Sequence, residues 1–336
     1  MRFFLIFTAL IVSLSAYSAK KAPAPAKKLK VVTTLSVLAS LTRELGAQHV
    51  EVASLTTASE DPHFVKAKPT FKRLVSEANL FVQIGRSLEL WVPLVIQSSG
   101  NAKLISHQIL VTASEGISAL EVPKALTRAQ GDIHPQGNPH VWLSPKAVLK
   151  IADNIKNALI KADTAHKADY ENNYKNFKDK LTSAMFGSDL VNKAKNNDLL
   201  WRLHEGDRLK KYIADRKLNL GGWLKQAQDI NYSFFTYHTV FSYMADDFNL
   251  KIVGQLEEKS GVQPTLKYQN ELIKKAKELG VKHIVAADYY RGNTKLIDHI
   301  AQAVGGRKLF VAVDSSSQQS YFDFMNNLIS ALVKFK

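Results

Sequence analysis

Cysteine is absent from this chain of 336 residues. Its absence excludes disulfide bonds, thiolate-ligated zinc or iron–sulfur sites, a cysteine nucleophile and lipid attachment at an N-terminal cysteine. Long apolar runs are also scarce, and beyond Leu14 no segment has the length and apolar character of a membrane-spanning helix. Since the composition is otherwise that of an ordinary globular protein, 336 residues predict two lobes, each with its own core.

Acidic residues are in deficit, with 30 Asp and Glu against 45 Lys and Arg and a net charge of +15. Such an excess can indicate binding to nucleic acid or to anionic membranes. Here the lysines are interspersed with Asp and Glu, as in residues 175–180 and 274–278, and form no basic arm. The charge therefore predicts a solvated basic surface, and we expect no nucleic-acid partner.

The first residues have the pattern of a secretory signal. Met1-Arg2 is followed by an apolar run over residues 3–14 and by small residues in Ala16-Tyr17-Ser18. A membrane anchor is the alternative, but the run is shorter than the roughly 20 residues that a spanning helix needs. We expect a signal peptide over residues 1–18, cleaved near Ser18/Ala19, a flexible tether over 19–29, and an exported, soluble protein without a lipid.

Strand and helix patterns alternate through the rest of the chain. Strands are predicted over residues 30–34, 49–55, 80–84, 109–112, 232–236, 250–253, 281–286 and 309–313, with 103–105 as a further candidate. Helices are predicted over 35–45, 163–184, 239–248, 264–279 and 294–304, and Ser144-Pro145 predicts an N-capped helix that runs to about Lys161. The alternation indicates two doubly wound α/β lobes, residues 30–162 and 196–336, joined by a connecting helix, residues 163–195.

Four metal-capable side chains fall near predicted carboxyl ends of strands, where ligands bind in such lobes. They are His63, His140, His238 and Asp288. Because they are far apart in the sequence, they form no local motif, and a packing or capping role for each stays open at this point.

Several short motifs give these positions more weight. They are Asp61-Pro62-His63-Phe64, the run from Gly131-Asp132-Ile133-His134-Pro135 to Gly137-Asn138-Pro139-His140-Val141-Trp142-Leu143-Ser144-Pro145, Gly221-Gly222-Trp223-Leu224, and Thr236-Tyr237-His238. In this order the chain resembles the metal-binding substrate-binding proteins of bacterial ABC importers, most of all their zinc-binding branch.

The resemblance implies a divalent metal in the cleft between two lobes that one long helix joins. His63 and His140 would be ligands from the N-terminal lobe, and His238 and Asp288 from the C-terminal lobe, with water as the alternative to Asp288. It also implies a monomeric periplasmic protein that binds zinc with high affinity, delivers it to a membrane permease and is not an enzyme.

Three imidazoles and one carboxylate suit tetrahedral zinc, whereas manganese prefers more oxygen ligands. A manganese- or iron-binding importer component, or a metal-dependent adhesin of the same fold, remains the alternative. A zinc hydrolase would need a general base beside the bound water, and an anion receptor would need glycine-rich helix N-termini. Neither pattern is present in these motifs.

Two further histidines stand outside this ligand set. His134 is interpreted as a turn residue exposed to water, with an auxiliary ligand as the alternative. His204-Glu205 is interpreted as surface, because no second histidine stands in helical register with it.

Overall fold

A computed structural model describes residues 28–123, 134–259, 261–292 and 294–335. The predicted signal peptide and most of the tether lie outside these residues. The described chain forms two four-stranded sheets in which every strand pair is parallel. The first has the order β2 (Val50–Ser54), β1 (Leu29–Thr33), β3 (Leu80–Gln83), β4 (Leu110–Thr112), and the second has the order β6 (Lys251–Gln255), β5 (Ser233–Thr236), β7 (His283–Ala287), β8 (Arg307–Val311). The two predicted α/β lobes are therefore confirmed, and both have the same strand order.

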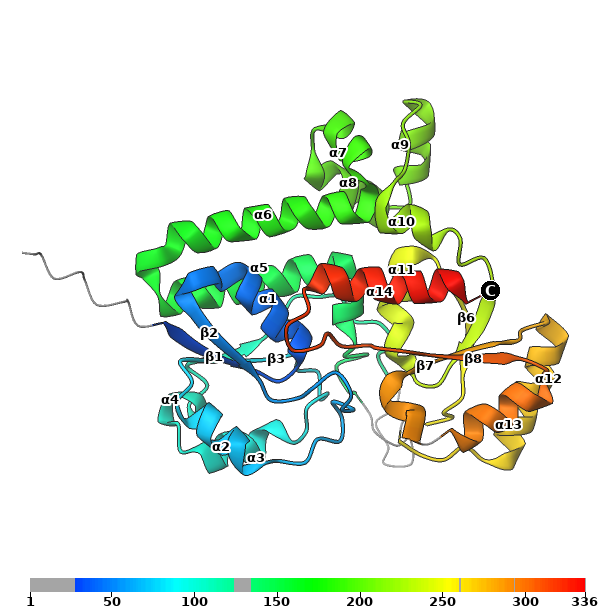
Figure 1. The fold of residues 1–336 in the computed structure, drawn as a ribbon, viewed down its shortest axis with the longest axis horizontal. Coiled ribbons are helices and arrows are strands. Elements are labelled where there is room, and N and C mark those ends of the chain that lie inside the picture. Colours follow the sequence, from blue (N-terminus) through cyan, green and yellow to red (C-terminus); the bar gives the residue numbers. More distant parts are fainter. Residues whose placement is uncertain (1–27, 124–133, 260, 293, 336) are drawn as a thin grey trace, which may run out of the picture.

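Helices cover both faces of each sheet (Figure 1). On one side the N-terminal lobe carries α1 (Ser36–Gly46), α5 (Pro145–Ala162) and α6 (Lys167–Phe186), and the C-terminal lobe carries α10 (Gly222–Ala227), α11 (Ser242–Phe248) and α14 (Tyr321–Lys334). On the other side lie α2 (Pro69–Ser76), α3 (Val92–Ser99), α4 (Ala102–Ile105), α12 (Leu266–Leu279) and α13 (Lys295–Ala303). Each sheet is thus buried on two faces, as its apolar strands require.

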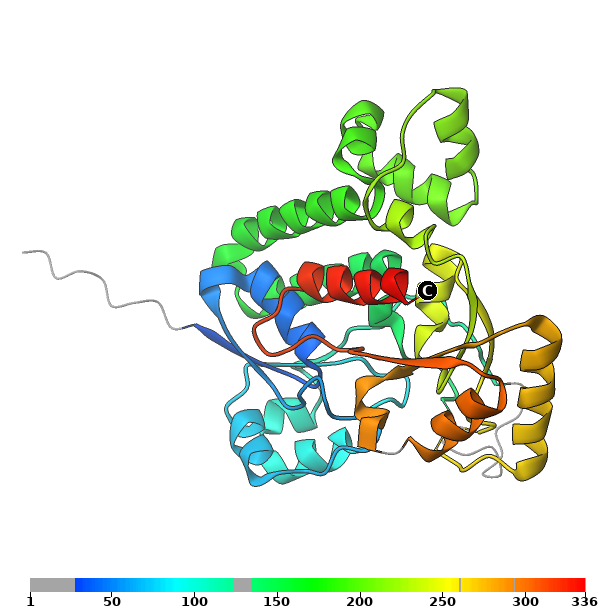
Figure 2. The ribbon, with the colours of Figure 1, turned by 45° about the vertical axis from the view of Figure 1, so that its right-hand side comes forward.

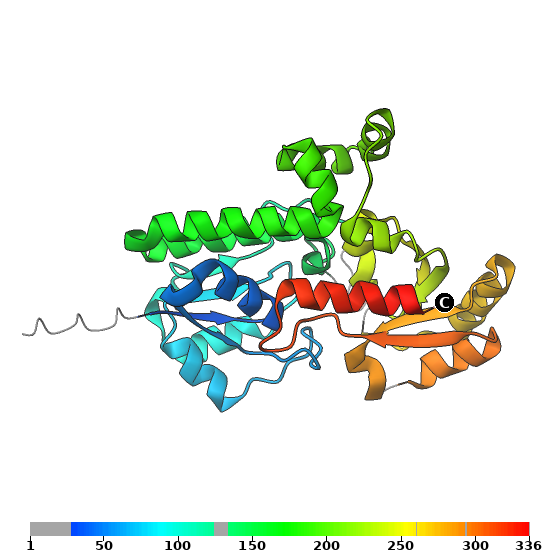
Figure 3. The same ribbon diagram turned by 45° about the horizontal axis from the view of Figure 1, so that its top comes forward.

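The long helix α6 runs from the N-terminal lobe towards the C-terminal lobe (Figures 1 and 3). At its end Gly187 meets the loop that leads into α10, where the Gly221 N–H donates to the carbonyl of Phe186 at 2.9 Å. Gly222 has φ +60°, and a Cβ there would lie 2.2 Å from the carbonyl oxygen of Ala184. Only glycine fits this junction between the two lobes.

Three short helices follow α6 and project from the body of the protein (Figure 2). They are α7 (Ser188–Ala194), α8 (Asn197–Glu205) and α9 (Leu209–Asp215). None of the helices in the described ranges combines the length and the apolar character needed to cross a bilayer.

Most of the predicted elements are present, with ends shifted by a few residues. The predicted N-cap is confirmed, since Ser144 Oγ accepts the backbone N–H of Ala147 at 3.0 Å and α5 begins at Pro145. The candidate strand over Lys103–Ile105 is wrong. These residues belong to α4, because the Asn101 side chain caps the N–H of Leu104 and starts a helical turn before β4.

The largest apolar cluster is continuous between the lobes. It joins residues beneath α1, α5 and α6 to residues of α14 and the second sheet, including Leu38, Phe177, Phe234 and Met325. Two smaller clusters fill the opposite faces, one beneath α2 and α3 and the other beneath α12 and α13. The lobes therefore share one core on the α14 side and have separate cores on the other.

Hydrogen bonds also cross between the lobes. The Trp142 indole N–H donates to the carbonyl of Val313 at 2.6 Å. Asp314, which follows β8, accepts the first backbone N–H groups of α1, from Val37 at 2.7 Å and Ser36 at 3.1 Å. Asp314 thus caps a helix of the other lobe, and burial raises the pKa of its carboxyl to about 6.

Candidate metal centre

The loop between β2 and α2 positions His63 through the Asp61-Pro62-His63 turn. Asp61 Oδ1 accepts both the backbone N–H of His63, at 3.0 Å, and its ring Nδ1, at 2.7 Å. The Trp91 indole N–H donates to the carbonyl of Pro62 at 2.9 Å and anchors the turn. Since Nδ1 faces an acceptor, it carries the proton, and the lone pair lies on Nε2.

Asn138-Pro139-His140 repeats this geometry. Asn138 Oδ1 accepts the backbone N–H of His140 at 2.9 Å and its Nδ1–H at 2.8 Å. The amide orientation of Asn138 is set by its Nδ2, which donates to Glu121 Oε2 and to the carbonyl of Thr239, both at 2.8 Å. Nε2 of His140 is therefore also the unprotonated nitrogen.

His238 lies two residues after β5 and obtains its support from a neighbouring strand end. Glu257, which follows β6, accepts the His238 Nδ1–H through Oε2 at 2.9 Å. The backbone N–H of Glu257 donates to the carbonyl of Tyr237 at 3.0 Å and joins the two loops. The third imidazole is thus held in the same tautomer as the other two.

The three rings converge on one point. Their centroids are 5.2 Å (His63 to His140), 5.3 Å (His63 to His238) and 5.1 Å (His140 to His238) apart. With a zinc–nitrogen bond of about 2.1 Å, and about 1.2 Å from nitrogen to ring centroid, imidazoles around one tetrahedral zinc have centroids roughly 5.4 Å apart, close to the observed distances. Each Nε2 is buried and has no hydrogen-bond partner within the described part of the chain. A single ion placed between the three Nε2 atoms would face all of them.

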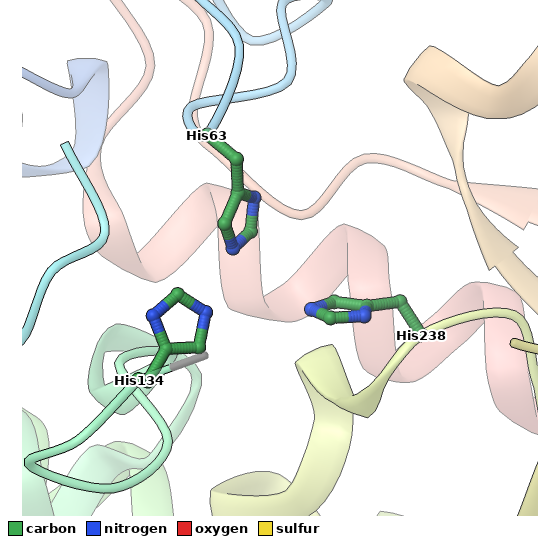
Figure 4. Close-up of side chains that lie close together, drawn as sticks. All are labelled: His63, His134 and His238. Carbon is green, nitrogen blue, oxygen red and sulfur yellow. The ribbon is translucent and has the colours of Figure 1, made fainter. Parts of the chain in front are cut away.

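His134 lies beside His63 and His238 (Figure 4). One ring nitrogen from each of His63, His134 and His238 lies within 4.8 Å of the other two. The side chain is buried, so the interpretation of His134 as an exposed turn residue is wrong. The sequence could not show this, because the burial of His134 depends on loops that lie far away along the chain.

Asp288 is not brought into the cluster. It begins a 3₁₀ turn, η6 (Asp288–Gly292), directly after β7, and its carboxylate pairs with Arg291 one turn later, with Oδ1 2.7 Å from Nη2 and 2.8 Å from Nε. About a third of its side chain, 32%, is exposed. Asp288 therefore remains a ligand predicted from the sequence alone.

Burial keeps His140 and His134 neutral. It lowers the pKa of His140 well below its usual value, and His238, His63 and His134 act in the same direction. Burial likewise lowers the pKa of His134 to about 3, against a smaller raising effect from the backbone of Arg86 and Ser87. Neutral imidazole is the form that binds a metal ion.

A cavity of about 190 Å³ leads to the cluster from one side. His63 and His238 line it together with the two carboxylates that support them, those of Asp61 and Glu257. Exposed Phe64 also lies along it. The cavity provides a path to two of the rings that is lined by negative charge.

His204 belongs to a separate buried group. Its ring packs against Phe186, and its Nε2 lies 4.0 Å from Asp247, which accepts the Ser144 hydroxyl at 2.5 Å. Burial lowers the pKa of His204 and raises that of Asp247. The surface interpretation is therefore wrong for His204, whereas Glu205 is exposed.

Sequence reasoning found the motifs but not the supporting roles of Asp61, Asn138 and Glu257. A signal for two of them was present, because Asx-Pro-His occurs twice and an Asx oxygen readily accepts hydrogen bonds two residues on. Glu257 has no such local signal, since it reaches His238 from the neighbouring strand.

Comparison with known proteins gives a family and several relatives. Residues 31–185 and 208–335 match the family described as zinc-uptake complex component A, periplasmic. The unmatched interval contains α7 and α8. The chain is 26% identical over 338 residues to the high-affinity zinc uptake system protein ZnuA of Bacillus subtilis, which covers 96% of this chain and 93% of that protein. It is 30% identical to the manganese ABC transporter substrate-binding lipoprotein PsaA of Streptococcus mitis, over 53% of this chain and 56% of the relative.

Solved structures share the fold. A crystal structure of ZnuA superposes with a TM-score of 0.66 at 20% identity, covering 92% of this chain and 98% of that one. The manganese-bound periplasmic metal-binding protein of Candidatus Liberibacter asiaticus superposes with a TM-score of 0.64 at 18% identity, covering 91% and 98%. At these identities the likeness establishes the two-lobed architecture alone.

Proposed function

Because the chain belongs to the family of the periplasmic component A of zinc-uptake complexes, the substrate-binding proteins of metal ABC importers, we propose that it binds zinc outside the cytoplasm and delivers it to an ABC-type permease. The observation that carries this proposal is the convergence of three buried Nε2 atoms, of His63, His140 and His238, each on a ring whose Nδ1 is hydrogen-bonded. Such pre-oriented neutral imidazoles are suited to a borderline metal ion.

Zinc is the cargo that this donor set favours. Zinc accepts three or four imidazoles in a tetrahedron with zinc–nitrogen bonds of about 2.0–2.1 Å. Manganese prefers carboxylate and water oxygens, and the carboxylates that line the cavity with His63 and His238, those of Asp61 and Glu257, are hydrogen-bonded to imidazole. A manganese-binding role, as named for the PsaA relatives, is the competing function that a direct titration decides.

A binding role fits the site better than hydrolysis. A zinc hydrolase holds a water on the metal beside a free general base. Asp61 and Glu257 both accept the Nδ1–H of a site histidine, which makes them supports of the ligands. We therefore propose a binding protein without catalytic activity, acting as a monomer, with lobes at residues 30–162 and 196–336 around a connecting helix within 163–195.

The proposed location is the periplasm. The signal-like residues 1–18 and the absence of cysteine support export without lipid attachment. Mass spectrometry of the exported protein should find an N-terminus near Ala19. An intact Met1, or recovery in the detergent phase alone, would contradict export as a free protein.

Isothermal titration of the metal-free mature chain with Zn²⁺ and, separately, with Mn²⁺ tests the function. We expect one zinc ion per chain, bound much more tightly than manganese. Manganese preference would move the protein to the manganese branch of the same importers. Failure to bind either ion would end the proposal of metal transport.

A further inference from the structure

His134 is the histidine of the cluster that the proposed ligand set leaves without a role. Resting on the proposed function, we propose that His134 is the fourth ligand, so that zinc is held by four imidazoles and no carboxylate. The His134 ring faces the same point as the rings of His63 and His238, and one nitrogen of each ring lies within 4.8 Å of the other two.

The position of the ring is close to that of a tetrahedral ligand. The His134 centroid lies 5.3 Å from that of His63, near the roughly 5.4 Å expected of rings around one tetrahedral zinc. The distance to the His140 centroid is 6.4 Å. An inward movement of about 1 Å by this ring brings it to tetrahedral spacing from His140.

Both ring nitrogens of His134 are buried, and the residue is only 8% exposed. Neither nitrogen has a well-formed hydrogen bond within the described ranges, although the backbone of Arg86 and Ser87 lies close enough to raise the pKa of the ring. A buried polar group without a partner is destabilising, so a histidine with a purely structural role normally has one. The other three site histidines each bond one nitrogen to the protein and leave the other free. A metal–nitrogen bond would satisfy one of the two nitrogens of His134.

One short segment delivers two of the four rings. The N–H of Gly137 donates to the carbonyl of His134 at 2.9 Å, and Gly137 has φ +85°. A Cβ on Gly137 would lie 2.7 Å from the carbonyl oxygen of Leu120. The turn therefore packs closely against its neighbour, and it returns the chain to Asn138 and His140 beside His134.

The competing fourth ligand is engaged elsewhere, since both contacts of Asp288 Oδ1 come from the Arg291 guanidinium. Four neutral imidazoles leave the centre with charge +2, whereas a carboxylate would reduce it to +1. An all-nitrogen shell also offers manganese and magnesium none of the protein oxygen ligands they prefer. His134 would therefore increase selectivity for zinc as well as affinity.

The test uses the mature chain and three variants: His134→Gln, Asp288→Asn, and His299→Gln as a control at an exposed helical histidine. Zinc affinity is measured by competition with a chromophoric chelator. Zinc K-edge X-ray absorption counts the imidazoles in the wild type and in His134→Gln. Thermal unfolding in chelator shows that each variant is folded.

We expect His134→Gln to lower zinc affinity by about 10-fold or more, and Asp288→Asn and His299→Gln to leave it unchanged. The absorption spectrum should show four imidazoles in the wild type and three in His134→Gln. Three imidazoles and an oxygen in the wild type, with weaker binding only in Asp288→Asn, would overturn the role of His134 and leave zinc binding intact. The wild-type spectrum decides the point even if His134→Gln does not fold. A wild type that binds no zinc would overturn both proposals.

Discussion

A single carboxylate oxygen of Asp61 accepts two hydrogen bonds from His63, one from its backbone N–H and one from its ring. The oxygen fixes the position of the residue and its tautomer at once. Both hydrogen bonds need only an acceptor oxygen at this position. An amide side chain can therefore supply the acceptor without the negative charge, and the two effects can be measured separately.

Asp61→Ala should lower zinc affinity by about 10- to 100-fold, the usual cost of losing the partner that orients a metal-binding histidine. Asp61→Asn retains an acceptor oxygen and should lose less than about 10-fold. Chelator competition on both variants measures the difference. Equal losses would show that the negative charge matters more than the hydrogen bonds.

Each of His63→Ala, His140→Ala and His238→Ala should weaken zinc binding by about 10-fold or more, since losing a ligand costs at least as much as losing its support. His299→Ala, on the exposed face of α13, is the matched control. Affinity equal to that of the wild type in any of the three variants would remove that residue from the site.

The raised pKa of the Asp314 carboxyl predicts that the stability of the metal-free protein depends on pH. Its carboxyl has a pKa of about 6 in the folded protein against about 3.9 when unfolded, so the folded state holds the proton more tightly. The contribution of this group to the free energy of unfolding is fully present below about pH 4 and is lost as the pH rises through about 6. The loss amounts to about 3 kcal/mol.

Asp314→Asn mimics the protonated form and lacks this dependence. Urea unfolding in chelator at about pH 4 and pH 7.5 should show the wild type losing stability relative to the variant as the pH rises. A constant difference between the two proteins would contradict a raised pKa at the helix cap.

Gly222→Ala should destabilise the protein by about 3 kcal/mol or more, because it adds left-handed strain to a clash with the carbonyl oxygen of Ala184. Gly280→Ala is the matched control. Its φ is +65°, but its Cβ would meet nothing within 4 Å, so only the strain of about 1–2 kcal/mol applies. Similar losses of unfolding free energy in the two variants, measured with urea, would show that the junction after α6 can relax around the added methyl group.

The features predicted well from the sequence were those with local causes. Ser144-Pro145 specifies a helix start by itself, and apolar β-branched runs bounded by helices specify parallel strands. The helix α14 went unassigned although its buried Phe322, Met325 and Ile329 have helical spacing. Lys103–Ile105 is too short for its apolar residues to distinguish a strand from a turn of helix.

The site was predictable as far as its motifs reach. Histidines that follow an Asx-Pro pair carry their own support, which explains why His63 and His140 stand out. His134 and Asp288 depend on side-chain direction, which loop packing and an Arg291 partner determine. The position of these residues in the sequence could not show that the His134 ring turns into the cluster, or that the Asp288 carboxylate pairs with Arg291 outside it.

The apolar core that runs without a break between the sheets also bears on how fast zinc leaves. Separating the lobes would expose this core at about 25 cal/mol for each Å². We therefore expect the lobes to stay together when zinc leaves, and the dissociation rate to follow the motion of the loops that carry His63 and His238. A partner that displaces these loops would then determine the moment of release without prising the two sheets apart.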